Sequence, residues 1–338
     1  MTASESAAPK VSVVIAARDA EATLPALLAA CAAQDHPGPL EVVVVDDGST
    51  DDTARVAREA GVRVVQQENR GPAAARNRGW REARAPVVLF TDSDCVPRSD
   101  WARRLAGGLD DDHAVSCGSY GIANPGNLLA ETVHAEILWR HSRLPDDVEF
   151  AGSYNLGVRR EALEAVGGFD EAYPVPSGED NDLSYRLRDA GHRIRFVRDA
   201  VVAHHHPVSL RRYLREQARH GAWRMVLYAR HPGRARGDGY AGPLDFAAPP
   251  LAVLSVAAAA VAPFWYGAAI VALLAFVAVA MIHDVIALQV SRHSGHSGSM
   301  ALAAFGTLRA YARGWGMLKG LALVASGAGR NAPAGSAP

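Results

Sequence analysis

The segment from Phe246 to Ile282 contains no charged residue and consists mainly of Ala, Val, Leu and Ile. One helix that crosses the hydrocarbon core of a bilayer needs about 20 such residues, so this run is long enough for two. Proline and aromatic residues at positions 263–266 mark the turn, because aromatic side chains favour the membrane interface. We therefore predict a hairpin of two transmembrane helices over residues 246–283. The alternative, a helical hairpin buried in a soluble protein, is disfavoured by the length and uniform apolarity of the run.

The first half of the chain alternates short apolar runs with helical patterns, which indicates βαβ units and a mostly parallel sheet. The predicted strands are 11–17, 41–45, 62–66, 87–90 and 193–203, and the predicted helices are 23–33, 53–60, 71–84 and 179–190. Residues 115–160 are more irregular. The fold class is therefore α/β, with one domain over residues 11–207.

Charge is unevenly distributed along the chain, although the formal net charge is only -1. Residues 1–207 carry 22 basic and 32 acidic side chains, whereas residues 208–236 carry eight arginines and one glutamate. An acidic body argues against nucleic acid as a partner. The basic segment 208–245, predicted as a juxtamembrane helix and linker, suits the anionic surface of a membrane.

The ends of the chain complete this organisation. Residues 299–326 mix apolar side chains with three basic ones, which predicts an amphipathic interfacial helix or else a third membrane span. The segments 1–10 and 327–338 are predicted to be disordered. The absence of a signal-peptide pattern and the three scattered cysteines favour a domain in the cytoplasm, attached to the cytoplasmic membrane. Two spans would keep both termini on that side.

Two aspartates, Asp92 and Asp94, follow the apolar run 87–90. In open α/β sheets, ligands bind at the carboxyl ends of the strands. Carboxylates at that edge suit a divalent cation that holds a diphosphate, and oxygen ligands are accepted by both Mg²⁺ and Mn²⁺. A solvated turn after the strand is the other interpretation of this short motif.

Four further motifs accompany this pair in the same order as in a known enzyme family. The five are Val44-Val45-Asp46-Asp47-Gly48-Ser49-Thr50-Asp51, Gly71-Pro72-Ala73-Ala74-Ala75-Arg76-Asn77, Asp92-Ser93-Asp94, Gly167-Gly168-Phe169-Asp170 and Gly178-Glu179-Asp180. In these motifs the chain resembles the family 2 glycosyltransferases over residues 11–230. The resemblance implies the GT-A fold, a nucleoside-diphosphate sugar as donor, and inversion at the transferred sugar.

The resemblance also implies roles for individual residues in binding the donor. Asp46 or Asp47 would contact the base, and uracil is the favoured base. Arg76 would pair with a phosphate or the base, Asp92 would bind the ribose, and Asp94 the metal. Ala17 and Ser93 complete the predicted donor site. For Asp46 and Asp47, an Asx-turn that closes the strand is the structural alternative.

The acidic pair Glu179-Asp180 begins a predicted helix. Inverting transfer needs a base that takes the proton of the acceptor hydroxyl, and we predict Asp180 for this role. Glu179 would position the acceptor or tune Asp180, and plain helix capping is the alternative for both. His204-His205-His206 follows the strand 193–203, and alternation would put His204 and His206 on one face. Relatives often carry a histidine here that reaches the metal or diphosphate.

These patterns together predict a membrane-anchored glycosyltransferase that acts on a lipid-linked or cell-envelope glycan acceptor. A non-catalytic protein that binds nucleotide sugars within a glycan-assembly complex is the alternative from another class. The intact aspartates at 92, 94 and 180 argue against it. A nucleotidyltransferase is disfavoured because residues 14–19 lack a glycine-rich loop.

Overall fold

The computed structural model describes residues 9–234, 242–295 and 298–327. The disorder predicted for the two ends falls largely outside these ranges. The chain divides into two compact units. Among the described residues, the sheet unit comprises 9–123 and Pro145–His205, and the helical unit comprises Asn124–Leu144 and those from His206 onward. The predicted domain 11–207 is therefore interrupted, because residues 124–144 belong to the helical unit.

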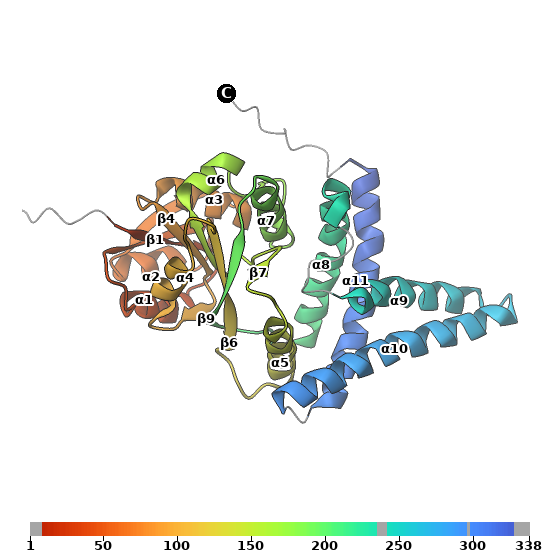
Figure 1. Cartoon of the computed structure of the whole chain (residues 1–338). Coiled ribbons are helices and arrows are strands. Elements are labelled where there is room, and N and C mark those ends of the chain that lie inside the picture. Colours follow the sequence, from red (N-terminus) through yellow and green to blue (C-terminus); the bar gives the residue numbers. More distant parts are fainter. Residues whose placement is uncertain (1–8, 235–241, 296–297, 328–338) are drawn as a thin grey trace, which may run out of the picture. The chain divides into compact units, whose positions relative to one another are not determined.

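The sheet unit contains a mixed, mostly parallel sheet, as predicted (Figure 1). Its strands are β1 (Val11–Ala17), β2 (Leu40–Asp47), β3 (Arg63–Gln67), β4 (Val87–Asp92), β5 (Cys95–Pro97), β6 (Val115–Ile122), β7 (Asp147–Val148), β8 (Asn155–Arg159) and β9 (Ile194–His204). Their order is β3-β2-β1-β4-β8-β6-β9-β5, with β7 also paired to β9. The strands β1 to β4 are parallel, whereas β8 is antiparallel to both β4 and β6.

Helices cover both faces of this sheet. They are α1 (Leu24–Ala32), α2 (Thr53–Glu59), α3 (Pro72–Glu82), α4 (Trp101–Gly107), α6 (Arg160–Val166) and α7 (Glu179–Asp189). Alternation along β1 places Val13 and Ile15 in a core with Leu24 of α1. Val14 points to the other face, where Gly79 of α3 approaches so closely that a Cβ atom would lie 2.3 Å from Val14 Cγ1. The helices α1 and α3 therefore lie on opposite faces.

Four strands end differently from the prediction, and one of them, β3, runs one residue further, to Gln67. β2 and β4 extend through Asp47 and Asp92. These aspartates are therefore the last residues of their strands and do not follow them. β9 ends at His204. The predicted alternation of His204 and His206 on one strand face is therefore wrong, because the chain leaves the sheet between them.

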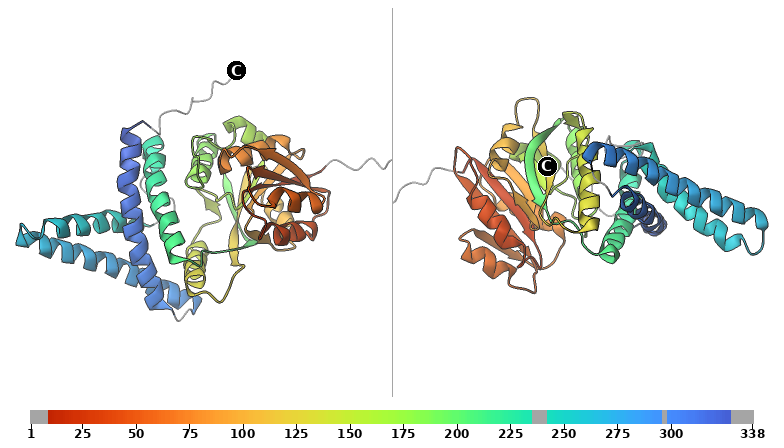
Figure 2. Two further views of the ribbon diagram at one scale, coloured as in Figure 1. Left: turned by 180° about the vertical axis from the view of Figure 1, so that it is seen from behind. Right: turned by 90° about the horizontal axis from the view of Figure 1, so that it is seen from below.

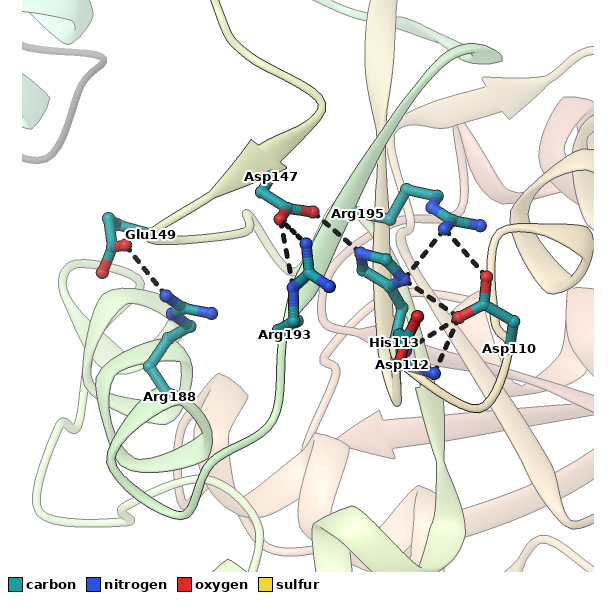
Figure 3. Close-up of polar contacts among 8 residues, drawn as sticks. All are labelled: Asp110, Asp112, His113, Asp147, Glu149, Arg188, Arg193 and Arg195. Carbon is teal, nitrogen blue, oxygen red and sulfur yellow. Dashed lines mark hydrogen bonds and ion pairs between the residues drawn. The ribbon is translucent and has the colours of Figure 1, made fainter.

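A buried histidine joins β7 to the start of β6 (Figure 3). His113 Nε2 lies 2.8 Å from Asp147 Oδ1, and His113 Nδ1 lies 2.9 Å from Asp110 Oδ1. Arg195 on β9 reaches the other oxygen of Asp110 at 2.8 Å. Because β6 runs parallel to β4, this cluster lies at the edge opposite the carboxyl end of β4. These contacts stabilise the end of the sheet at which β4 and β6 begin.

We expect Asp110→Asn to lower the melting temperature at neutral pH. Hydrogen bonds from His113 are the main cause that lowers the pKa of Asp110 to about 2. A carboxyl group whose folded pKa is depressed stabilises the fold above its unfolded pKa of about 4, and this stabilisation is lost as the pH falls toward 2. Melting curves of both proteins between pH 7 and pH 2 test this. A difference that stays constant down to pH 2 would contradict it.

The helical unit contains α5 (Leu128–Ser142), α8 (Leu210–Arg230), α9 (Pro243–Val261), α10 (Tyr266–Ser294) and α11 (Ser299–Ala325). α9 and α10 form a hairpin that turns at 262–265, and α10 continues past the predicted end at residue 283. Both helices are long and apolar enough to cross a membrane, and only 22% of each apolar window is buried. Such exposure suggests membrane association. α11 does not reach this standard of apolarity, and its role as an interfacial helix or a third span stays a prediction.

The helices α8 and α11 lie side by side, and the α9–α10 hairpin projects from them (Figures 1 and 2). Glycine permits their close approach: a Cβ atom on Gly316 would lie 1.9 Å from the carbonyl oxygen of Ala218. A second glycine one turn along, Gly320, meets Ala222 in the same way. Contacts between small residues thus hold the two helices together without bulky side chains in the seam.

A buried ion network joins α5 to the C-terminal helices. Glu136 accepts hydrogen bonds at 2.8 Å on each carboxylate oxygen from Arg309 of α11. Arg140 binds Glu136 at 2.7 Å and also binds Asp245 at the start of α9 at 2.7 Å. Burial opposes the charge of Glu136, but Arg309 and Arg140 outweigh it and hold its pKa well below the usual range. This network explains why residues 124–144 belong to the helical unit.

Candidate functional site

The candidate site lies at the carboxyl ends of β1, β2 and β4. Strand register places Ala17 opposite Asp46 and Ala16 opposite Asp92. The predicted donor residues Ala17, Asp46 and Asp92 therefore share one edge of the sheet. Ser93 and Asp94 form the turn that leads from β4 to β5. This is the edge at which parallel sheets bind ligands.

Asp46 and Asp47 are both buried and both hydrogen-bonded. Asp46 accepts from the Ser49 backbone N–H at 3.0 Å, which is the Asx-type contact that the sequence allows, and from Gln66 at 3.0 Å. Asp47 accepts from the backbone N–H groups of Arg70 and Gly71, each at 2.9 Å. Asp47 thus anchors the loop that precedes α3.

Arg76 is the buried centre of the site. It lies on α3, whose start is fixed by Gly71 at φ 90°, where a Cβ atom would come within 2.6 Å of the Pro174 carbonyl oxygen. Its guanidinium donates to Asp92 Oδ1 at 2.8 Å and to Glu179 Oε1 at 2.9 Å. Burial works against the charge, but the carboxylates of Asp92 and Glu179 raise the pKa of Arg76 above its usual range.

Glu179 and Asp180 begin α7 but occupy different environments. Glu179 is 3% exposed, and its Oε2 atom has no hydrogen-bond partner among the described residues. Burial and then the charge of Asp180 raise the pKa of Glu179 to about 7, against the pull of Arg76. Asp180 is only partly buried, and its Oδ1 atom accepts from the Asn181 backbone N–H at 2.8 Å. Asp180 can therefore contact a ligand, whereas Glu179 is buried and binds Arg76.

A second cluster joins Asp94 to His204. Antiparallel pairing of β5 with β9 sets His204 opposite Cys95, so His204 Nε2 lies 3.6 Å from Asp94 Oδ2. One ligand atom from each of Asp94, Cys95 and His204 falls within a 4.8 Å group. Burial raises the pKa of Asp94, and Asp92 adds to this, while His204 opposes it. Burial also raises the pKa of the Cys95 thiol, which remains a weak ligand.

This donor set fits a divalent cation. A carboxylate and an imidazole are ligands that Mn²⁺ and related metals accept, and a cation would relieve the unfavourable burial of the Asp94 charge. The sequence gives no acidic neighbour for His204, because Asp94 is brought to it only by the pairing of β5 with β9.

The predicted role of His206 finds no such support. His206 belongs to the helical unit, where its backbone N–H donates to Asn124 at 2.9 Å and its Nε2 lies 3.3 Å from His134 Nδ1. Metal binding by His206 stays a prediction. The ring of Tyr120, which sequence reasoning missed, lies 5.3 Å from that of His204. The sequence patterns predict no strand over residues 115–122, so nothing in them indicates Tyr120.

Comparison with known proteins points to one family for residues in the first half of the chain. Residues 12–167 match the model of glycosyl transferase family 2. This stretch, just under half of the chain, is similar to the family 2 glycosyltransferases. The pre-mycofactocin glycosyltransferase of Mycobacterium tuberculosis is 34% identical over 209 residues, which are 58% of this chain and 44% of that protein. Glycosyltransferase AglE of Haloferax volcanii is 29% identical over 209 residues, 58% of this chain and 67% of AglE.

The chain is also similar in fold to a solved structure. A mannosyltransferase from Pyrobaculum calidifontis, solved with GDP-Man and Mn²⁺, has a TM-score of 0.56 at 21% sequence identity. The match covers 93% of this chain and 87% of that one, and it supports the GT-A fold. The chain spans about half the length of the first curated relative.

Proposed function

We propose that this glycosyltransferase is membrane-anchored and inverting, and that it moves a sugar from a nucleoside-diphosphate donor to a hydroxyl group. A UDP-sugar is the favoured donor, and the acceptor is a lipid-linked or cell-envelope glycan. The observation that carries the proposal is the gathering of Arg76, Asp92 and Asp94 with Asp180 at the ligand-binding edge of the sheet. The α9–α10 hairpin is the proposed anchor, with the sheet unit in the cytoplasm.

Each residue has a proposed part in binding the donor. Asp46 contacts the base, because each of its oxygens accepts one hydrogen bond from Ser49 or Gln66 and can accept a second, whereas Asp47 Oδ1 already accepts two. Asp92, oriented by Arg76, binds the ribose. Asp94 and His204 would hold a divalent cation, as Mn²⁺ is bound in the similar mannosyltransferase structure. A cation there stabilises the negative charge that develops on the departing diphosphate.

Asp180 is the proposed general base. As the acceptor oxygen attacks C1 of the sugar, its proton passes to the Asp180 carboxylate, and the bond from C1 to the diphosphate oxygen breaks. A base must touch the acceptor, and the partial exposure of Asp180 permits this whereas the burial of Glu179 does not. Glu179 is therefore assigned to holding Arg76 and tuning Asp180, and not to contacting the acceptor.

Thermal shift of the full chain in detergent tests the donor site, with UDP-, GDP-, dTDP- and CMP-sugars in the presence and absence of Mn²⁺. One nucleotide class should raise the melting temperature by about 5 °C or more at 100 times its Kd, and only with the metal. Asp94→Ala should abolish the shift. Asp35→Ala, at a carboxylate that is 71% exposed, is the matched control and should retain it. No shift with any donor would overturn the proposed donor site.

A further inference from the structure

A groove with apolar walls and a basic rim runs between α8 and α11. Its volume is about 860 Å³, within the range of pockets that hold a small ligand. The apolar residues of α8 in this groove recur every four positions: Leu210, Leu214, Ala218 and Ala222. A basic residue comes directly after each of the first three: Arg211, Arg215 and Arg219. α11 contributes Ala312, Trp315 and Lys319. One wall is therefore apolar while the rim beside it is cationic.

The arginines of this rim lack acidic partners in the described part of the chain. The neighbouring Glu216 pairs instead with Arg212. The Nε atom of Arg219 is buried without a hydrogen-bond partner among the described residues. The local field is correspondingly positive: burial, followed by the charges of Arg313, Arg219 and Arg224, lowers the pKa of His220 to about 3. The groove is thus a cationic site without an anion from the protein.

The position of the groove indicates the occupant. α11 packs on the proposed membrane hairpin through Gly314, where a Cβ atom would lie 2.7 Å from the Pro249 carbonyl oxygen of α9. Trp315 and Leu318 of α11 are 57% and 42% exposed. An amphipathic pair of helices attached to a membrane hairpin meets the headgroup region, where basic side chains bind anionic headgroups and apolar ones contact acyl chains.

We propose that this groove binds one anionic phospholipid of the bilayer. The lipid phosphate lies among Arg215, Arg219 and Lys319, and an acyl chain runs along the apolar wall of α8. Trp315, over whose ring the Lys319 ammonium lies at 5.2 Å, closes the α11 side. This inference rests on the proposed membrane attachment, and it is independent of the transfer reaction.

Native mass spectrometry of the full chain in detergent tests the proposal, with phosphatidylglycerol and phosphatidylcholine as probes. We expect phosphatidylglycerol to bind at least tenfold more tightly than phosphatidylcholine. The double variant Arg215→Gln/Arg219→Gln should weaken phosphatidylglycerol on the order of twentyfold, since each basic residue near an anionic surface contributes about fivefold. Ala312→Phe, which fills the groove and retains every charge, should also weaken it.

The controls separate this groove from other sources of binding. Arg55→Gln/Arg58→Gln removes two exposed charges from α2 and should bind phosphatidylglycerol as the wild type does. Soluble glycerol 3-phosphate should not displace the lipid at equal concentration, because it lacks an acyl chain. Displacement by glycerol 3-phosphate, equal binding of both lipids, or unchanged binding by the double variant would each overturn the proposal. Failure of membrane attachment would appear separately, as a chain that stays soluble without detergent, and failure of the proposed donor site as a missing donor shift.

Discussion

Replacing Asp180 with Asn should lower the rate of sugar transfer by about 10²–10⁴-fold, because general base catalysis contributes about that much. The side chain keeps its shape but can no longer take the proton of the acceptor hydroxyl. Donor binding should survive, since the contacts proposed for the donor come from Asp46, Asp92 and Asp94. The measurement is the transfer rate at saturating donor, together with the thermal shift by the same donor.

Two comparisons make this result specific to a base. Asp189→Asn, at the other end of α7, changes the same chemical group and should leave transfer unchanged. Glu179→Gln should act differently, because Glu179 binds Arg76 and not the acceptor: it should reduce the donor-induced shift as well as the rate. Full transfer by Asp180→Asn would refute the assignment of the base.

The second large effect concerns the stability of the helical unit. Glu136→Gln should cost about 3–5 kcal/mol, because removing one partner from a buried ion network leaves uncompensated charge behind. Here the charge left is that of Arg309, which is less than 10% exposed, whereas Arg140 keeps Asp245 as a partner. Denaturant unfolding of the full chain in detergent, monitored by tryptophan fluorescence, to which Trp139 on the same helix contributes, measures the loss.

Glu216→Gln on α8 is the matched control. Its carboxylate pairs with Arg212, which is 71% exposed, and such surface pairs are worth about 0–1 kcal/mol. The same substitution should therefore change stability little there. A second variant, Glu136→Gln with Arg309→Met, should recover part of the loss, since it removes a stranded charge together with its partner. Equal stability of Glu136→Gln and the wild type would show that α5 is held by apolar packing alone.

Local patterns were sufficient for most elements of the sheet. The apolar run at 11–17 is β1 at the predicted bounds, and the helix predicted over 179–190 is α7 at 179–189. Alternation and helical periodicity depend on neighbours within a few residues, so one sequence reveals them. The ends of β2 and β4 were missed because strand pairing extends through acidic residues when the adjacent strand continues.

The candidate site was predictable in residue type and only partly in geometry. The motifs indicated Asp92, Asp94 and Asp180. The hydrogen bond from Arg76 to the buried Glu179, however, joins residues 103 positions apart. The contact of His204 with Asp94 depends on the register of β5 against β9. Neither relation leaves a periodic signal, because each arises from how separate elements pack.

By itself, the sequence determined the class of fold, the order of β1 to β4 with the helices between them, the apolar hairpin and the residue types available for the donor. Tertiary structure alone decided which carboxylates are buried, which arginine each one binds, and that residues 124–144 join the helical unit through Glu136 and Arg309, 173 positions apart. The physical reason is that local preferences act between neighbours along the chain. Burial and charge pairing depend on the distance in space between groups that the sequence keeps far apart.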